Sequence, residues 1–117
     1  MSHTYKRSDL PQGVDLDLVT TEEHRIRGLY YRALRELVDG RAHIPNNWIR
    51  WIRPSAQTLY QAGLIDIKEE DDPDILRQIK KRGSHRKPGY VYCRLLHYAL
   101  ALYLLGKYEH RKPVIED

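Results

Sequence analysis

The chain has 117 residues, a length typical of one domain. Charged residues make up 31% of it and hydrophobic residues 41%, a balance that excludes a fibre, a collagen-like chain and wholesale disorder. The net charge of +4 favours an acidic partner only mildly, because the same excess also serves solubility.

Residues 1–19 are expected to form an N-terminal arm. Val14, Leu16 and Leu18 alternate with aspartates, and this two-residue period predicts a short strand or an extended docked segment. A frayed terminus is the alternative. The N-terminal residues carry charge and no apolar run, so we expect no signal peptide.

A first helix is predicted from Thr20 or Thr21 to Gly40. Thr20 and Glu23 have the spacing of a capping box, and Gly40 is a natural helix end. Apolar residues recur at the three- and four-residue spacing of one helix face: Ile26, Leu29, Tyr30, Ala33, Leu34, Leu37 and Val38.

Two further helices are predicted before the first clear strand. His43 and Ile44 fit a very short strand, and Asn46 or Asn47 can cap a helix that carries Trp48, Ile49, Trp51 and Ile52. Pro54 breaks that helix and is well tolerated in the first turn of the next one, so a third helix is expected over residues 54–62.

The second half of the chain is expected to contain two strands and two helices. Alternating residues predict strands over 65–68 and 90–93, with a short helix from Pro73 and a basic loop over 80–89 between them. The segment 95–108 reads as an apolar helix, too short to cross a bilayer, which needs about 20 residues. Residues 109–117 form a polar tail. The domain itself is expected over residues 20–108.

This order resembles a winged-helix DNA-binding domain. The resemblance is carried by residues 54–65 (PSAQTLYQAGLI) and 87–92 (KPGYVY), which look like a recognition helix running into the first wing strand and like the start of the second wing strand. The last helix looks like the dimerisation helix of small bacterial and archaeal winged-helix regulators. The resemblance implies an α+β, mostly helical winged helix-turn-helix fold. It also implies that the helix over 54–62 enters the major groove.

Polar residues of the third helix and its surroundings are candidate DNA contacts. Glutamine can pair with adenine and arginine with guanine, while serine and threonine can bond phosphates. An ordinary solvated helix face is the alternative reading. The candidates in this region are Arg50, Arg53, Ser55, Gln57, Thr58 and Gln61.

A cationic segment between the two strands is the strongest electrostatic feature. Six Lys and Arg residues fall within positions 77–87, and such a segment can follow a phosphate backbone. The alternative is charge balance against six acidic residues within positions 66–74. The candidate phosphate contacts are Lys80, Lys81, Arg82, His85, Arg86 and Lys87.

Two tryptophans and the last helix are candidate interaction surfaces. Trp48 and Trp51 lie three apart and would share one helix face, either as core or as a stacking platform or partner surface. The last helix is apolar on nearly every side, which predicts a twofold homodimer, or else a central core helix in a monomer. Its expected dimer contacts are Leu96, Leu100, Tyr103 and Leu104.

Catalytic, metal and cofactor sites are not expected. The histidines are scattered without a metal-binding spacing, and neither a nucleophile with its base nor a glycine-rich phosphate loop is apparent. The single cysteine, Cys93, excludes an internal disulfide and a cysteine-built zinc site. It favours a reducing compartment, hence the cytoplasm, and it reads as a packed small side chain.

The sequence therefore predicts a dimeric protein that binds duplex DNA, a small transcriptional regulator with no enzyme activity. One alternative is a protein-interaction module, an adaptor or inhibitor that uses the tryptophans and tyrosines and binds no nucleic acid. Another is association with RNA or the ribosome through the same cations.

Overall fold

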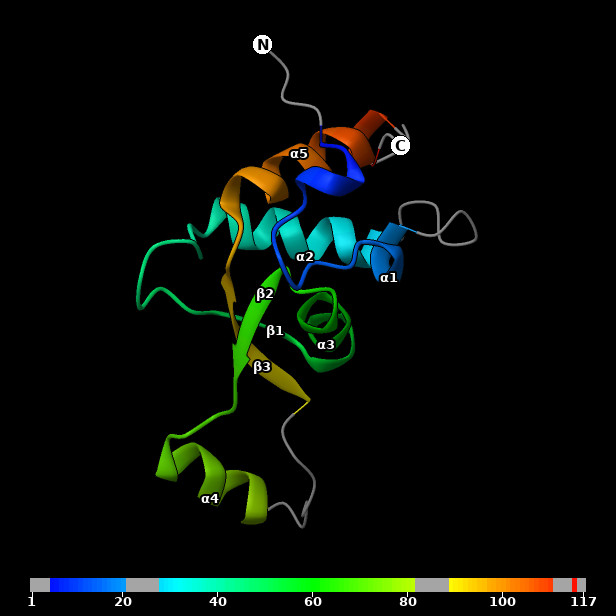
Figure 1. The fold of residues 1–117 in the computed structure, drawn as a ribbon. Coiled ribbons are helices and arrows are strands. Elements are labelled where there is room, and N and C mark those ends of the chain that lie inside the picture. The colour runs from blue at the N-terminus through cyan, green and yellow to red at the C-terminus, as the bar shows by residue number, and fades with distance from the viewer. Residues whose placement is uncertain (1–4, 21–27, 82–88, 111–114, 116–117) are drawn as a thin grey trace.

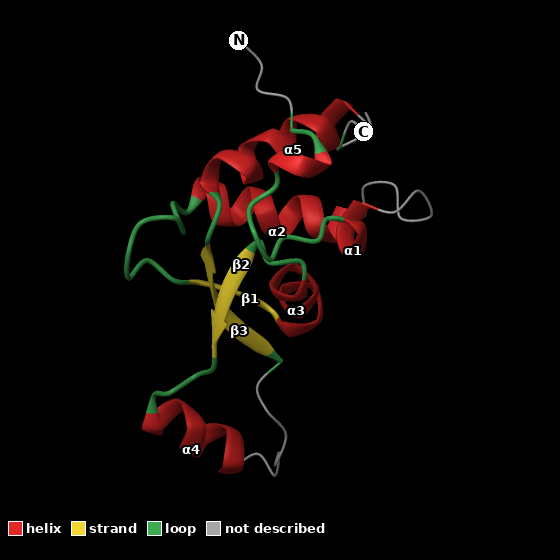
Figure 2. Cartoon of the chain, in the orientation of Figure 1, coloured by secondary structure: helices red, strands yellow, loops and turns green. Residues whose placement is uncertain are grey.

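The computed structural model describes residues 5–20, 28–81, 89–110 and 115, and it shows an α+β fold about half of which is helical. The helical elements are η1 (Arg7–Asp9), α1 (Asp17–Thr20), α2 (Gly28–Asp39), α3 (Arg53–Gln61), α4 (Pro73–Lys81) and α5 (Tyr98–His110). The strands are β1 (Ile49–Ile52), β2 (Ile65–Lys68) and β3 (Tyr90–Leu95). Figures 1 and 2 show the sheet between α4 at one end of the molecule and α2 and α5 at the other.

The strands form one antiparallel sheet in the order β1-β3-β2. Ile65 pairs with Leu95 and Ile67 with Cys93, so the two strands predicted over 65–68 and 90–93 are confirmed as partners. Strand β3 continues to Leu95, two residues beyond its predicted end, because Leu95 completes this pairing. The last helix consequently begins at Tyr98 rather than at residue 95.

The predicted helix over residues 46–52 is wrong, because this segment contains β1. Ile49 pairs with Cys93 and Ile52 with Tyr90, and β-branched and aromatic residues favour such a half-buried pleated surface. Of the two further helices predicted before the strand over 65–68, only the second forms, as α3 between β1 and β2. The short strand expected at His43 and Ile44 does not form either, since these residues lie in turns.

The start predicted for the first helix lies largely outside the described residues. Thr20 belongs to α1, and α2 is described from Gly28, so the cap proposed at Thr20 or Thr21 stays a prediction. The capping partner Glu23 and the predicted helical residue Ile26 lie outside the described residues. Helix α2 ends at Asp39, directly before Gly40, as its sequence predicts.

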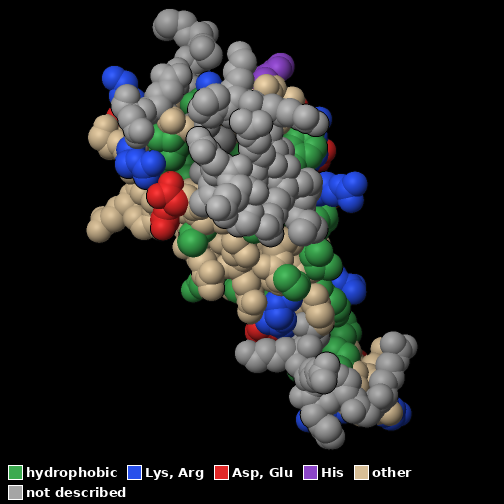
Figure 3. Space-filling view, turned by 90° about the vertical axis from the view of Figure 1, so that its right-hand side faces the viewer, with side chains coloured by type: hydrophobic (Ala, Val, Ile, Leu, Met, Phe, Trp, Pro, Cys, Tyr) green, Lys and Arg blue, Asp and Glu red, His purple; other side chains and the backbone are tan. Residues whose placement is uncertain are grey.

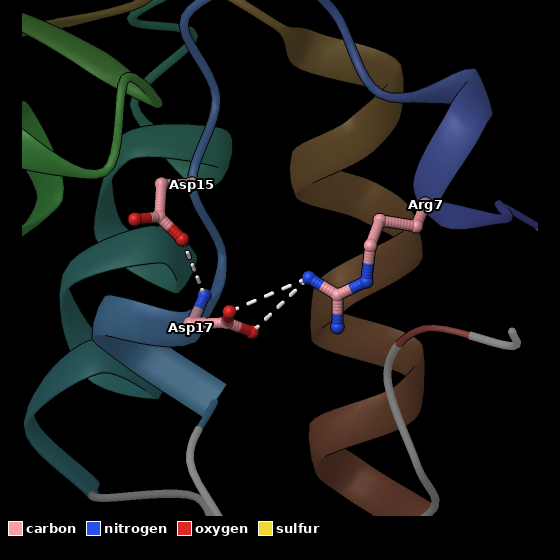
Figure 4. Close-up of polar contacts among 3 residues, drawn as sticks. All are labelled: Arg7, Asp15 and Asp17. Carbon is pink, nitrogen blue, oxygen red and sulfur yellow. Dashed lines mark hydrogen bonds and ion pairs between the residues drawn. The ribbon is translucent and has the colours of Figure 1, made fainter.

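The N-terminal arm is docked against the domain and forms helical turns rather than a strand. Leu16 and Val19 are fully buried in the core. The carboxylate of Asp15 accepts a hydrogen bond from the Asp17 amide at 3.1 Å, and Arg7 forms an ion pair with Asp17 at 3.4 Å (Figure 4). The arm is thereby a structural part of the domain.

The arm crosses the turn between α3 and β2 at close range. The amide of Asp15 donates to the carbonyl of Ala62 at 2.9 Å. Gly63 in this turn has a φ of +80°, and a Cβ placed there would overlap the carbonyl oxygen of Gly13. Glycine suits this position for two reasons, the left-handed backbone and the close approach of a second chain segment.

The core lies between the sheet, α2, α3 and α5. Leu34 and Leu37 of α2, Leu59 of α3 and Leu104 of α5 are all completely buried. Helix α5 is apolar on nearly every side, but only one side faces this core. On the other side, Tyr98 and Leu102 are 38% and 44% exposed. The core thus needs only one side of the predicted apolar helix.

Candidate nucleic-acid interface

Helix α3 presents a narrow polar face to solvent. Pro54 lies in its first turn, where the missing amide hydrogen costs nothing, and the helix ends before the Gly63 turn. Ala56 and Leu59 are buried against the sheet and the core, whereas Gln57 and Gln61 are exposed. The two glutamines are four residues apart and therefore lie on the same side of the helix.

Arg53 and Ser55, predicted as DNA contacts, are engaged within the protein. The Arg53 guanidinium donates to both carboxylate oxygens of Glu69 at 2.5 and 2.6 Å, and this hydrogen bonding raises the pKa of Arg53. Ser55 is 4% exposed, and its hydroxyl oxygen accepts a hydrogen bond from the Trp51 indole at 2.8 Å. The assignment of Ser55 to DNA contact is wrong, because its side chain faces the interior.

Thr58 is half-buried and donates its hydroxyl to the Pro54 carbonyl at 3.2 Å. Tyr60, which the sequence analysis did not single out, is 49% exposed. On the side of the molecule seen in Figure 3, the coloured Lys and Arg side chains are scattered and do not gather into one patch. The exposed face of α3 therefore offers hydrogen-bonding groups more than charge.

The first two cations of the predicted basic loop lie on α4. Lys80 and Lys81 are exposed in the last turn of this helix, where the helix dipole favours positive charge. The helix thus takes the first two residues of the predicted loop. Arg82, His85, Arg86 and Lys87 lie outside the described residues, and their role in phosphate contact stays a prediction.

The acidic stretch beside α4 has other partners among the described residues. Glu69 binds Arg53, Glu70 accepts a hydrogen bond from the Tyr92 hydroxyl, and Asp74 pairs with Arg77 at 2.5 Å. Within the described part of the chain, no ion pair joins this stretch to Lys80 or Lys81. These two lysines therefore keep their charge available to an external partner.

The outer face of the sheet is a second candidate surface that the sequence analysis missed. Arg50 was expected on a helix, but it lies on β1, exposed and with its guanidinium carbon 3.6 Å from the centre of the Tyr90 ring. Lys68 of β2 places its ammonium group 4.7 Å from the Trp48 ring. The alternation of residues 90–94 already indicated which side chains of this strand share a face. The corresponding residues of β1 were missed because residues 46–52 were predicted as a helix.

The two tryptophans do not share a face. Trp51 is half-buried, packs against the core and donates its indole hydrogen to Ser55, so the core interpretation holds for this residue. Trp48 is half-buried beside Lys68. A spacing of three places two side chains together on a helix but on opposite faces of an extended chain.

The expected dimer contacts on α5 divide into two groups. Leu100 and Leu104 are 1% and 0% exposed within a single chain, so the prediction that they contact a second copy is wrong. Tyr103 is half-buried, with its ring 4.9 Å from that of Tyr5. Leu96, directly before the helix, is 48% exposed.

The described residues contain no reactive cysteine, metal-binding cluster or membrane-spanning helix. Cys93 is fully buried, and desolvation raises the pKa of its thiol to about 11, as expected for a packed side chain. No group of three or more His, Cys, Asp or Glu residues in the described ranges is arranged to hold a metal ion. No helix in the same ranges has the length and apolar character to cross a membrane.

Comparisons with known proteins add no relative. No family model matches the chain, and neither does any curated protein or solved structure.

Proposed function

We propose that the protein binds duplex DNA as a small winged-helix-like regulator. The observation that carries this proposal is the sheet order β1-β3-β2 with α3 leading directly into β2. A helix in that position, followed by a long connection between two paired strands, has the arrangement of a recognition helix and a wing. In this chain the connection contains α4 and its exposed lysines.

The exposed side chains support a division of labour. Gln57 and Gln61 can form paired hydrogen bonds with adenine edges, which carries sequence information. Tyr60 can donate its hydroxyl to a phosphate oxygen. Lys80 and Lys81 attract the phosphate backbone without reading sequence, and their contribution depends on salt.

Removing the α4 lysines should weaken binding to duplex DNA of any sequence. We expect the Lys80→Ala/Lys81→Ala double variant to lower affinity for a random duplex and to reduce the slope of log affinity against log salt by about 2. A mobility-shift titration at several salt concentrations measures both quantities. The matched control is Lys6→Ala/Lys107→Ala. It removes the same total charge from the residue before η1 and from α5.

The two double variants separate local contact from net charge. Equal losses in both would show that only the overall charge matters, and the role of α4 would fail. The absence of a shift by the wild-type protein at low salt would overturn DNA binding and favour the protein-interaction alternative. Ser55→Ala, which changes a side chain that faces the interior, should leave the affinity of the folded protein unchanged.

We further propose that the exposed side of α5 forms a homodimer. Tyr98 and Leu102 lie one turn apart on the side of α5 that does not face the core, and Leu96 precedes them. A row of large exposed apolar side chains favours contact with another surface. Figure 1 shows α5 and α4 at opposite ends of the molecule, so such a dimer leaves the α4 lysines free.

A charge at Leu102 should dissociate this dimer. Light scattering of the wild-type protein is expected to give twice the chain mass of 13.9 kDa, and Leu102→Glu is expected to give the mass of one chain. The control is Gln57→Glu, which adds the same charge on α3. A wild-type particle of one chain mass at high concentration would refute the dimer.

A further inference from the structure

The strand register places a set of aromatic and cationic side chains on one face of the sheet. Directly opposite residues in an antiparallel pair share a face. Val91, Cys93 and Leu95 of β3 are buried, so the residues between them, Tyr90, Tyr92 and Arg94, point to the outer face. Their partners Arg50 and Ile52 on β1, and Asp66 and Lys68 on β2, lie on that face as well.

Two cations already lie on aromatic rings of this face. The Arg50 guanidinium carbon is 3.6 Å from the Tyr90 ring centre, and the Lys68 ammonium is 4.7 Å from the Trp48 ring. Both cations are exposed, whereas Tyr90 and Trp48 are half-buried. Each pair therefore combines a flat apolar surface with a positive charge that remains in contact with solvent.

The central ring, that of Tyr92, is held in place by a hydrogen bond to Glu70. Its hydroxyl donates to the Glu70 carboxylate at 2.6 Å, and this hydrogen bond raises the pKa of Tyr92 to about 12. Glu70 is itself 7% exposed and also accepts a hydrogen bond from the Asp72 amide at 3.0 Å. The Tyr92 ring also lies edge-on to Tyr90, with 6.2 Å between their centres. The ring is thus preorganised, which lowers the entropy cost of binding.

Helices α2 and α3 do not cover this face. They pack against the sheet through the buried residues of the inner face. The outer side chains include three cations, Arg50, Lys68 and Arg94, against the half-buried carboxylate of Asp66, since Glu70 is turned toward Tyr92. We name Trp48, Arg50, Lys68, Tyr90 and Tyr92 the outer-face platform.

We propose that the outer-face platform binds single-stranded nucleic acid by stacking unpaired bases on its rings. Every base has a flat π-face, so stacking on aromatic side chains and on a guanidinium needs no particular sequence. Arg50 and Lys68 supply the positive charge that the phosphates between those bases require. An apolar protein surface is a poorer fit, because it would meet the charges of Arg50 and Lys68 beside the rings. Ile52 is the exposed aliphatic side chain of this face. The proposal does not depend on α3, which lies on the other side of the sheet.

Fluorescence anisotropy with labelled oligothymidine and oligouridine tests the proposal. Binding of either oligonucleotide by the wild-type protein supports it. Trp48→Ala and Tyr90→Ala are each expected to weaken binding about fivefold or more, while Trp48→Phe retains most of the affinity. Tyr31→Ala is the matched control, because it removes a ring that is half-buried like Tyr90 but lies on α2.

A second variant avoids the risk that loss of a half-buried ring harms folding. Arg50→Gln changes an exposed side chain, and we expect it to lower the affinity and the salt dependence while the circular dichroism spectrum stays that of the wild type. Lys80→Ala/Lys81→Ala should affect duplex DNA far more than the single strands, so failure of duplex binding and failure of the platform are distinguishable. Absence of binding to both oligonucleotides by folded wild-type protein would overturn the proposal, as would equal losses for Tyr31→Ala and Tyr90→Ala.

Discussion

Gly63→Ala should destabilise the protein by more than about 2 kcal/mol. The backbone of Gly63 has a φ of +80°, which costs any residue with a Cβ about 1–2 kcal/mol. The added Cβ would also overlap the Gly13 carbonyl oxygen, a backbone atom that cannot rotate away. Urea unfolding followed by circular dichroism measures the loss.

Gly89→Ala is the matched control for this effect. Gly89 does not have a positive φ, and a Cβ placed there meets no atom within 4 Å. We expect its unfolding free energy to stay within about 0.5 kcal/mol of the wild type. Should Gly63→Ala be equally harmless, the docking of residues 13–15 on the turn after α3 would be refuted.

Leu104→Ala is expected to lower the unfolding free energy by about 2–5 kcal/mol. Leu104 is completely buried in the core of one chain, so the substitution removes buried apolar surface and leaves a cavity. The loss should be the same at low and high protein concentration, because it arises within the monomer. Thermal or urea unfolding at two concentrations measures it.

Leu102→Ala provides the comparison on the same helix. Leu102 is 44% exposed, and at protein concentrations where the chain is monomeric we expect its truncation to cost less than about 1 kcal/mol. A large, concentration-dependent loss for Leu104→Ala would instead return that residue to the subunit interface. The pair of variants therefore distinguishes the core side of α5 from its exposed side.

Local patterns predicted much of this fold. Alternation identified β2 and the first part of β3, and Pro54 and Gly63 bracket α3 as expected. The apolar segment near the C-terminus forms α5, although its first three predicted residues belong to β3 and the following turn. In each case the signal lies within a few neighbouring residues, which is where propensity and period act.

The errors arose where distant residues decide the structure. Trp48-Ile49-Arg50-Trp51-Ile52 fits a helix or a strand by its own pattern, and pairing with β3 some 40 positions later selects the strand. The involvement of Arg53 with Glu69 and of Ser55 with Trp51 likewise depends on the sheet. Composition reveals which side chains can bind DNA, but only tertiary contacts show which ones are already engaged.

The sheet separates the only two tryptophans of the chain. The indole of Trp51 is hydrogen-bonded to Ser55 on the core side, and that of Trp48 lies under the Lys68 ammonium on the other side. The protein thus contains two natural fluorophores in different surroundings. Emission from a version that retains one of them reports separately on melting of the interior and on events at the surface.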